Sequence, residues 1–535
     1  MPNTAPVNLD LLSREVARRR TFAIISHPDA GKTTLTEKLL LYAGAVDLAG
    51  AVRERKNQRH ATSDWMAMEQ ARGISITATA LEMEYQGFHV NLLDTPGHQD
   101  FSEDTYRTLM AADSAVMVLD SAKGIEPQTE KLFHVCRMRG IPILTFINKL
   151  DHPGRDPLDL LDEIERKLGI SVAPFNWPIG DGPWFQGVYD LQRQQVLRYQ
   201  RTAGGAARAP VEVTGLDDPA LPTLLGDEAS DRLREDADLL AGAGSSFDRA
   251  RFLSGEVSPV FFGSALNNFG VELFLNELLT LAPAPGRREA GETTVAPVSE
   301  RFSGFIFKVQ ANMDPRHRDH MAFLRVCSGR FQRDMVVYNS SRKQKLRLSR
   351  AFRLFARDRE PVDEAFPGDV IGVISPGLFA IGDTVTEGED FEFGDIPRFP
   401  PEHFSVLINT DVTRYKQFHR GLTQLEAEGA VQVFYEENGT RRDPILGAVG
   451  ELQFDVVLGR LQDEYGVEAR IERLPVACAR WIVDRGISFD RLKLSRRAGL
   501  RCRDRDGRPV ILFSSTWDLE RFQKDDPDVA LSDVS

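Results

Sequence analysis

Residues 22–34, FAIISHPDAGKTT, combine a short apolar run, a tight loop with Gly31 and Lys32, and the start of a helical pattern. Strand, loop and helix form the context in which backbone N–H groups and a helix N-terminus bind phosphate oxygens. In such a P-loop Lys32 contacts the β and γ phosphates, and the Thr33 hydroxyl holds Mg²⁺. Because Ser26 stands where the P-loop pattern begins with glycine, a plain glycine-containing turn of an α/β domain is the alternative. The predicted phosphate-binding residues are Ser26, His27, Pro28, Asp29, Ala30, Gly31, Lys32, Thr33 and Thr34.

A second motif, DTPGH, begins at the acid that ends the apolar run at residues 88–94. An acid at the carboxyl end of a strand, followed by a Pro-Gly turn, lies where open α/β sheets bind their ligands. Asp94 can hold Mg²⁺ through a water molecule, and the Gly97 N–H can meet a γ-phosphate. The alternative is an ordinary Pro-Gly turn with a capping Asp. The predicted nucleotide-binding residues of this motif are Asp94, Thr95, Pro96 and Gly97.

A third motif, NKLD, follows an apolar run at residues 142–147. The carboxylate of Asp151 can accept hydrogen bonds from both N1–H and N2–H₂ of guanine, which adenine cannot offer, and such paired bonds discriminate by on the order of 10⁴-fold. Alone, this motif could be a charged strand-to-helix turn, but after two phosphate motifs at strand ends it indicates guanine. A Ser-Ala turn near residue 265 can offer N–H groups to guanine O6. The predicted residues here are Asn148, Lys149, Asp151, Ser264, Ala265 and Leu266.

The composition is that of a globular protein of several domains. The 535 residues are 42% apolar and 27% charged, and the length predicts about three or four domains. No apolar run approaches the roughly 20 residues of a membrane span. The four cysteines are far apart, which favours reduced thiols and a cytoplasmic location. The net charge of −13 argues against a protein that coats nucleic acid, although local basic patches remain possible.

The composition and the hydrophobic periodicity of the sequence change along the chain. Residues 45–73 are charged and lack a sustained period, which predicts a mobile or ligand-ordered loop. A Pro- and Gly-bearing linker at 283–300 indicates a domain boundary. We expect a multidomain α/β chain: a P-loop GTP-binding domain at 12–284 with an insertion at about 174–258, a β-barrel domain at 301–392, a ferredoxin-like α+β domain at 402–520 and a disordered tail at 521–535.

The motifs SHPDAGKTT, RGISI, DTPGH, NKLD and SAL, in this order, resemble the GTP-binding domain of translational GTPases. The resemblance implies that His98, in DTPGH, is the catalytic residue that positions the attacking water when the ribosome pushes it into place. A lone His after Pro-Gly is otherwise a solvated turn residue. The resemblance also implies that Ser75 stands at a second Mg²⁺ ligand position, where the family has Thr. It thus implies GTP and GDP as ligands, with Mg²⁺ held by Thr33, Ser75 and Asp94.

The segments GSALNNFGV, FPGDVIGV and RYKQFHRGLTQLEAEGAVQVF resemble the release-factor branch of this family, and the resemblance runs from about residue 12 to about residue 515. The resemblance implies two further domains for translocation factors, and because the sequence ends at residue 535 we expect a termination factor instead. The resemblance implies a monomeric, ribosome-stimulated GTPase that promotes dissociation of the peptide-releasing class I release factor after peptide release. The alternatives are a translocase-like relative and a GTPase switch that does not act on the ribosome.

Overall fold

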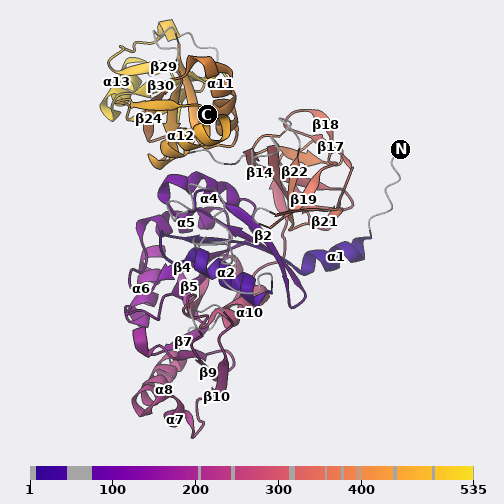
Figure 1. Cartoon of the computed structure of the whole chain (residues 1–535), viewed down its shortest axis with the longest axis vertical. Helices are drawn as coiled ribbons and strands as arrows, with labels where there is room; N and C mark the ends of the chain where they lie inside the picture. The colour runs from indigo at the N-terminus through magenta and orange to yellow at the C-terminus, as the bar shows by residue number, and fades with distance from the viewer. Residues whose placement is uncertain are drawn as a thin grey trace.

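The computed structural model describes residues 8–44, 75–202, 207–242, 247–311, 320–355, 358–374, 379–394, 396, 399–437, 443–484 and 489–533. The loop predicted at 45–73 lies outside these residues. The chain forms three parts (Figure 1): an N-terminal domain with elements α1 to α10, a middle domain with β14 to β23, and a C-terminal domain with β24 to β31.

The N-terminal domain is built on a sheet with the strand order β2-β3-β1-β4-β5-β11-β6. Neighbouring strands are parallel except β2 and β3, which form an antiparallel pair. The central strands are continuous apolar runs because helices cover both of their faces. The strands are β1 (Arg19–Ser26), β2 (Thr79–Tyr85), β3 (Phe88–Asp94), β4 (Ser114–Asp120), β5 (Ile143–Asn148), β6 (Ser171–Pro174) and β11 (Val257–Phe262).

Two hydrophobic cores lie on the two faces of this sheet. Along β4, Val116 and Val118 belong to the core under α2 and α10, whereas Ala115 and Met117 belong to the core under α5 and α6. This alternation is the period of two of a β-strand. The helices of the N-terminal domain are α1 (Leu9–Ala17), α2 (Lys32–Tyr42), α4 (Ser102–Leu109), α5 (Pro127–Met138), α6 (Pro157–Leu168) and α10 (Val271–Leu281), with a short helix η2 (Gln99–Phe101) before α4.

The segment predicted as an insertion folds at the end of the N-terminal domain farthest from the C-terminal domain (Figure 1). Its antiparallel sheet has the order β10-β9-β8-β7. Trp177 and Val188 on this sheet, together with Leu221 and Leu233 on its helices, join the core under α5 and α6. The elements are β7 (Asn176–Ile179), β8 (Gly187–Asp190), β9 (Gln195–Tyr199), β10 (Val211–Gly215), α7 (Leu221–Leu225), α8 (Asp227–Gly242) and α9 (Arg249–Leu253).

The middle domain consists of antiparallel strands, in accordance with the expected β-barrel. The order is β18-β17-β23-β14-β15-β22-β19, and β19 also pairs with β2 of the N-terminal domain. A buried cluster that includes Phe302, Ile306 and Leu324 fills its interior. The strands are β14 (Ser303–Ala311), β15 (His320–Ser328), β16 (Phe331–Gln332), β17 (Val336–Asn339), β18 (Gln344–Arg347), β19 (Ala351–Phe355), β20 (Asp358–Pro361), β21 (Glu364–Ala365), β22 (Val370–Ile374) and β23 (Thr384–Thr386).

The C-terminal domain begins with a βαββαβ unit whose strands lie in the order β27-β24-β26-β25. This is the ferredoxin-like arrangement expected from the alternation of strand and helix patterns in the sequence. The remaining strands extend the same sheet beyond β25. The elements are β24 (His403–Asn409), α11 (Tyr415–Ala427), β25 (Gln432–Glu436), β26 (Ile445–Ala448), α12 (Leu452–Tyr465), β27 (Ala469–Arg473), β28 (Cys478–Ile482), β29 (Gly499–Asp504), β30 (Pro509–Phe513), α13 (Thr516–Asp525) and β31 (Leu531–Ser532).

The expected fold class is therefore confirmed, but the end of the chain differs from the predicted disordered tail at 521–535. The last turns of α13 and strand β31 fall within that range. Phe522 is 2% exposed, and Leu519 and Leu531 pack against the same cluster. Sequence patterns do not predict this packing, because the apolar residues of the segment are few and stand among charged ones. The other domain limits stay a prediction.

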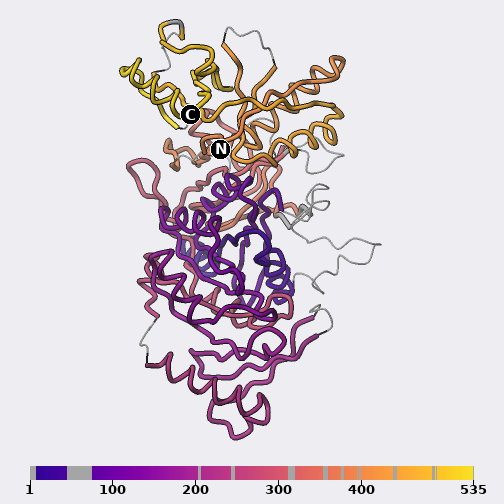
Figure 2. Tube along the Cα trace, turned by 90° about the vertical axis from the view of Figure 1, so that its left-hand side faces the viewer, coloured from indigo at the N-terminus to yellow at the C-terminus, as the bar shows by residue number. Residues whose placement is uncertain are grey.

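Buried charges join the middle domain to the N-terminal domain. Arg19 Nε lies 2.7 Å from Asp369 Oδ1, and both side chains are buried. Arg325 is 1% exposed and donates to Thr21 Oγ1 and to Asp113 Oδ2, each at 2.5 Å. Figure 2 shows the C-terminal domain, in orange and yellow, stacked over the end of the N-terminal domain that carries α4.

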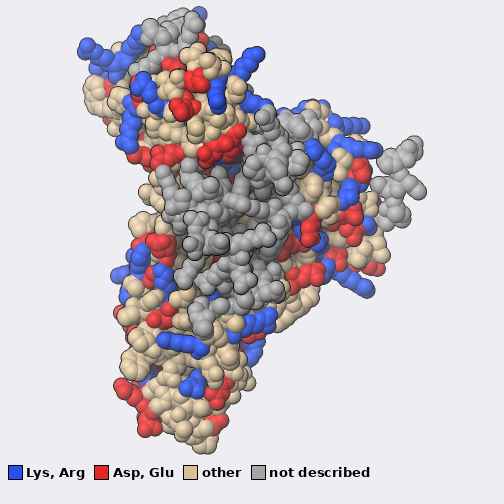
Figure 3. Space-filling view, viewed as in Figure 1, with Lys and Arg blue, Asp and Glu red and all other residues tan. Residues whose placement is uncertain are grey.

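Charges are mixed over the molecular surface, and basic side chains project from the outer edges of the C-terminal domain (Figure 3). Arg470, Arg473 and Arg496 of this domain have side-chain exposures of 63%, 72% and 67%. The net negative charge therefore coexists with exposed cations on one domain.

Candidate functional site

The four sequence motifs meet at one edge of the N-terminal sheet. Each begins at the carboxyl end of a parallel strand: β1, β3, β5 or β11. Ile24 of β1 pairs with Asp94 of β3, and Val260 of β11 pairs with Thr145 of β5. Parallel strands bring their carboxyl ends to the same edge, which is where α/β sheets bind ligands.

The loop after β1 has the backbone of a phosphate-binding turn. Asp29 and Gly31 have φ values of 65° and 92°, and α2 begins directly after Gly31. A Cβ on Gly31 would collide with the side-chain amide of Asn148, so glycine is required there for space as well as for conformation. The first N–H groups of a helix have no partner within the helix, so the N-terminus of α2 can donate to phosphate oxygens.

Lys32 and Asp94 form a buried ion pair between the first two motifs. The Lys32 Nζ lies 2.6 Å from Asp94 Oδ1, and the two residues are 5% and 2% exposed. Thr95 Oγ1 donates to the carbonyl of Ile24 at 2.6 Å, which fixes the start of the DTPGH turn against β1. Gly97 lies close to the backbone of Pro28, so the turn and the P-loop are neighbours.

The second carboxylate oxygen of Asp94 fits a Mg²⁺ ion bound at this site. Asp94 Oδ2 is buried and has no hydrogen-bond partner within the described part of the chain. An unpaired buried carboxylate oxygen is costly, and a hydrated cation would satisfy it. Those residues contain no cluster of three or more His, Cys, Asp or Glu side chains able to hold a metal.

Asn148 braces the P-loop against the loop after β11. Its Nδ2 donates to the carbonyl of Ala30 at 2.9 Å, and its Oδ1 accepts from the N–H of Ala265 at 2.9 Å. The side chain is buried. Sequence reasoning placed Asn148 in the nucleotide site, whereas the structure shows it linking two loops of that site.

The rest of the NKLD motif is held by a neighbouring acid. Lys149 has a φ of 67°, and its Nζ lies 2.9 Å from Asp120 Oδ2. Burial alone would raise the pKa of Asp120, but hydrogen bonds from Lys149 and the Ala122 N–H outweigh it, so this pKa lies below its usual value. The side chain of Asp151 is 8% exposed.

The SAL turn lies beside NKLD. The Leu150 N–H donates to the carbonyl of Gly263 at 3.3 Å, and Ser264 Oγ accepts from the Asn267 N–H at 3.2 Å. Leu266 is 52% exposed. The structure thus brings together Asp151, Ser264 and Ala265, the residues predicted to read guanine.

His98 lies at the end of the DTPGH turn with 30% of its side chain exposed. Its Nδ1 accepts from the N–H of Asp100 at 3.3 Å, and Asp100 Oδ1 lies 3.3 Å from the same atom. The resemblance also implies that Ser75 is a Mg²⁺ ligand. Ser75 is partly exposed and is the first described residue after position 74.

Three acids at this site were missed by sequence reasoning: Asp100, Asp120 and Glu126. Glu126 Oε2 lies 2.7 Å from His27 Nδ1, which also lies 2.6 Å from the carbonyl of Pro28. Burial lowers the pKa of His27, and Glu126 opposes this shift. Asp100 follows His98 by two residues, and Asp120 ends β4; neither position belongs to a nucleotide motif. The binding roles of the predicted site residues stay predictions.

Family models match the three parts of the chain. The elongation factor Tu GTP binding domain matches residues 17–284, elongation factor G domain 2 matches 301–388, and the class II release factor RF3 C-terminal domain matches 393–523. A crystal structure of a Thermus thermophilus protein has a TM-score of 0.68 over 85% of this chain and 67% of that chain, at 24% identity. This structural likeness concerns the fold alone.

Curated relatives resemble the chain over nearly its full length. Peptide chain release factor 3 of Gloeobacter violaceus is 56% identical over 98% of this chain and 99% of the relative. Those of a Cyanothece species and of Symbiobacterium thermophilum are each 54% identical, over 98% and 97% of this chain and 96% and 98% of the relatives.

An elongation-factor-type GTP-binding domain, followed by an elongation factor G type second domain, defines a translational GTPase. Within this class, the chain belongs to the peptide chain release factor 3 family. It is a GTPase of translation termination that hydrolyses GTP and interacts with the ribosome. The resemblance to the release-factor branch is confirmed, and the translocase and non-ribosomal alternatives are not favoured.

None of the helices within the described ranges is both long enough and apolar enough to cross a membrane.

Proposed function

We propose that this GTPase removes the class I release factor from the ribosome after the peptide has been released. The observation that carries the proposal is the meeting of the phosphate, guanine and His98 motifs at one sheet edge, in a chain whose last part matches a class II release factor domain. GTP binding would favour the ribosome-bound state, and hydrolysis would let the protein leave. Such γ-phosphate-dependent ordering of loops is a common basis for switching.

In this proposal each motif has one task. Lys32 and the N-terminus of α2 bind the phosphates, the carboxylate of Asp151 reads N1–H and N2–H₂ of guanine, and His98 positions the attacking water. Asp94, Thr33 and Ser75 would hold Mg²⁺, which neutralises charge on the phosphates when bound. Asn148 keeps the phosphate and guanine loops at a fixed separation.

We further propose that the protein acts as a monomer in the cytoplasm. All four cysteines are free; Cys136, Cys327 and Cys502 are buried, and burial raises the pKa of the Cys136 thiol to about 12. Free, unreactive thiols suit a reducing compartment.

The test follows a fluorescent class I release factor bound to ribosomes that have completed peptide release at a stop codon. With this protein and GTP, its dissociation should accelerate, whereas ribosomes alone define the basal rate. Equal dissociation rates with and without the protein, under conditions in which it hydrolyses GTP, would refute the proposed role.

A further inference from the structure

The segment that follows His98 carries the contact with the C-terminal domain. Asp100, in η2, is 8% exposed, and its Oδ2 accepts from the backbone N–H of Leu452 at 2.8 Å. Leu452 is the first residue of α12, and Glu451, the residue at the N-cap of this helix, makes no side-chain capping bond. The carboxylate of Asp100 therefore caps α12 from another domain, at the positive end of the helix dipole.

The loop before α12 fits closely around the carboxylate of Asp100. A Cβ on Gly450 would collide with the carboxyl group of Asp100, so only glycine lets α12 approach so closely. Gln453 holds the loop before the helix, because its Oε1 accepts from the N–H groups of Val449 at 2.7 Å and Gly450 at 3.1 Å. The loop is thus held in place on the C-terminal side of the interface.

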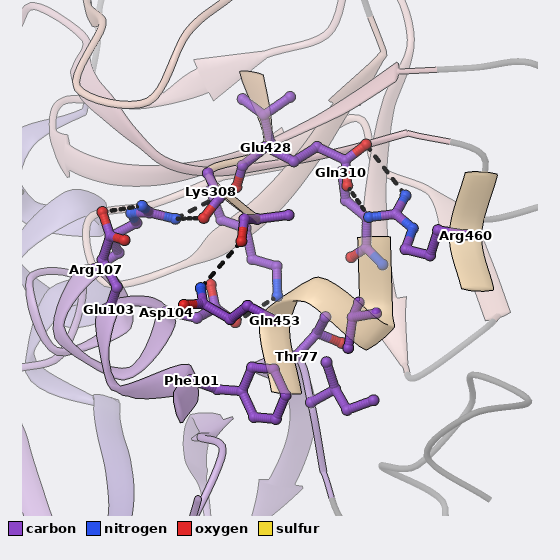
Figure 4. A pocket seen from close by; sticks show the side chains of 15 residues that line it. Thr77, Phe101, Glu103, Asp104, Arg107, Lys308, Gln310, Glu428, Gln453 and Arg460 are labelled. Carbon is purple, nitrogen blue, oxygen red and sulfur yellow. Dashed lines mark hydrogen bonds and ion pairs between the residues drawn. The ribbon is translucent and has the colours of Figure 1, made fainter. Parts of the chain in front are cut away.

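Arg107, two turns after Asp100, contacts the opposite end of another helix of the C-terminal domain. Arg107 of α4 donates to the carbonyls of Glu428 and Gly429, at 3.3 and 3.4 Å, at the C-terminal end of α11. Glu103 pairs with the same guanidinium, and Arg107 is 6% exposed. Figure 4 shows Arg107 between Glu103 and the end of α11. An acid therefore meets the start of one helix and a base meets the end of the other, as the two dipoles favour.

The interface also includes an apolar contact and the middle domain. Phe101 packs with Ile76 and with Val456 of α12 in one buried cluster. Lys308 Nζ of β14 lies 3.1 Å from Asp104 Oδ2 (Figure 4). It also donates to the carbonyl of Ala78 at 2.6 Å. All three domains thus contact the segment of about ten residues that begins after His98.

Asp100 connects this interface to His98. One carboxylate oxygen holds α12, and the other lies 3.3 Å from His98 Nδ1. The Asp100 backbone N–H contacts the same ring nitrogen, so Nδ1 faces Asp100 and Nε2 is the nitrogen left for a water molecule. We propose that Asp100 is a positioning residue through which the C-terminal domain sets the orientation of the His98 imidazole. This rests on the water-positioning role of His98 in the proposed function.

Three variants separate the two halves of this link. Gly450→Ala displaces α12 from Asp100 and keeps the carboxylate. Asp100→Asn keeps an oxygen for the Leu452 N–H and loses the charge beside His98. Asp100→Ala loses both side-chain contacts and keeps only the backbone N–H that faces His98 Nδ1. Gly215→Ala is the control, because a Cβ there has no atom within 4 Å.

The experiment measures ribosome-stimulated GTP hydrolysis and GTP affinity of the full chain. Small misplacement of a catalytic group costs up to about 100-fold in rate, so kcat should fall between about 10- and 100-fold in Asp100→Ala and at least about 3-fold in Gly450→Ala and Asp100→Asn. GTP affinity and the KM for ribosomes should match the control. A purely structural interface would instead raise the KM or weaken GTP binding while kcat stayed the same.

A kcat in Asp100→Ala and Gly450→Ala equal to that of Gly215→Ala would overturn the proposal. His98→Ala, measured in parallel, distinguishes failure of the positioning role of Asp100 from failure of the water-positioning role of His98. If His98→Ala loses stimulated hydrolysis while the Asp100 and Gly450 variants retain it, only the positioning role of Asp100 fails. If His98→Ala retains it, the role of His98 fails as well.

Discussion

Lys32 and Asp94 form an ion pair across the ends of two neighbouring parallel strands, with Lys32 Nζ 2.6 Å from Asp94 Oδ1. Both side chains are buried, and the second oxygen of Asp94 has no hydrogen-bond partner in the described residues. The pair therefore holds the P-loop against the DTPGH turn and leaves a carboxylate oxygen for a cation. Breaking it leaves an uncompensated buried charge, which costs roughly 3–5 kcal/mol.

Asp94→Asn should weaken GTP binding and remove most of its dependence on Mg²⁺. The amide cannot balance the charge of Lys32 and is a poorer partner for a hydrated cation. We expect GTP affinity in Mg²⁺ to fall by at least about 10-fold, which corresponds to about 1.4 kcal/mol. Titration with a fluorescent GTP analogue, with Mg²⁺ and with a chelator, measures both effects. An unchanged ratio of the two affinities would exclude Asp94 from the metal site.

Asp151→Asn should change the preferred base. A carboxylate accepts two hydrogen bonds from guanine, whereas an amide can donate one to a carbonyl at the same position of xanthine. The affinity for GTP should fall by about 10³-fold or more, and xanthosine triphosphate should become the better ligand. Competition binding with both nucleotides measures the change. If guanine remained preferred, Asp151 would not be the residue that reads the base.

Asn148→Ala should weaken the binding of GTP and GDP to a similar extent. The substitution leaves the carbonyl of Ala30 and the N–H of Ala265 without their partner, and each unsatisfied buried group costs about 1–3 kcal/mol. Because the brace touches both loops, the loss should not depend on the γ-phosphate. Dissociation rates of the two nucleotides measure it, with Gly215→Ala as control. A loss confined to GTP would contradict a bracing role.

His89 should make the contact between the N-terminal and middle domains sensitive to pH. Its Nε2 lies 2.9 Å from Glu82 Oε1 and 3.2 Å from Asp369 Oδ1. Burial alone would lower the pKa of His89, but the carboxylates of Asp369 and Glu82 outweigh it and raise this pKa from 6.5 to about 9. A raised pKa stabilises the fold fully below about pH 6.5, and this stabilisation is lost as pH rises through about 9.

His89→Gln tests this prediction. Relative to the variant, the native chain should have a higher free energy of unfolding at about pH 6 than at about pH 9.5, by roughly 3 kcal/mol. Urea unfolding of both proteins at the two pH values gives the difference. A difference between native chain and variant that is the same at both pH values would mean that His89 is not charged in the folded protein.

Local patterns predicted the parts of the site that depend on chain order. The strands and helices around Lys32, Asp94 and Asn148 have the periods that sequence reasoning uses, and each motif stands at a strand end. Parallel pairing then brings those ends together without further information. Thr33 at the start of α2 and Gly31 before it were predictable for the same reason.

Contacts between residues far apart in the sequence could not be predicted in this way. Asp100 and Leu452 are 352 positions apart, and their contact depends on how two domains meet. The bracing role of Asn148 needs the positions of Ala30 and Ala265, which only the folded sheet provides. The packing of Phe522 in α13 was missed because a charged, aspartate-rich segment resembles a disordered tail.

The central claim is that His98 positions the attacking water when the ribosome activates the protein. GTPases of this kind hydrolyse slowly alone, on the order of 10⁻⁴ to 10⁻² per second, so the activator sets the rate. The direct test compares GTP turnover by the native chain and by His98→Ala, each with and without ribosomes. We predict equal GTP affinity, strong stimulation of the native chain, and a stimulated rate at least about 100-fold lower in the variant. Stimulated turnover by His98→Ala at the native rate would contradict the account.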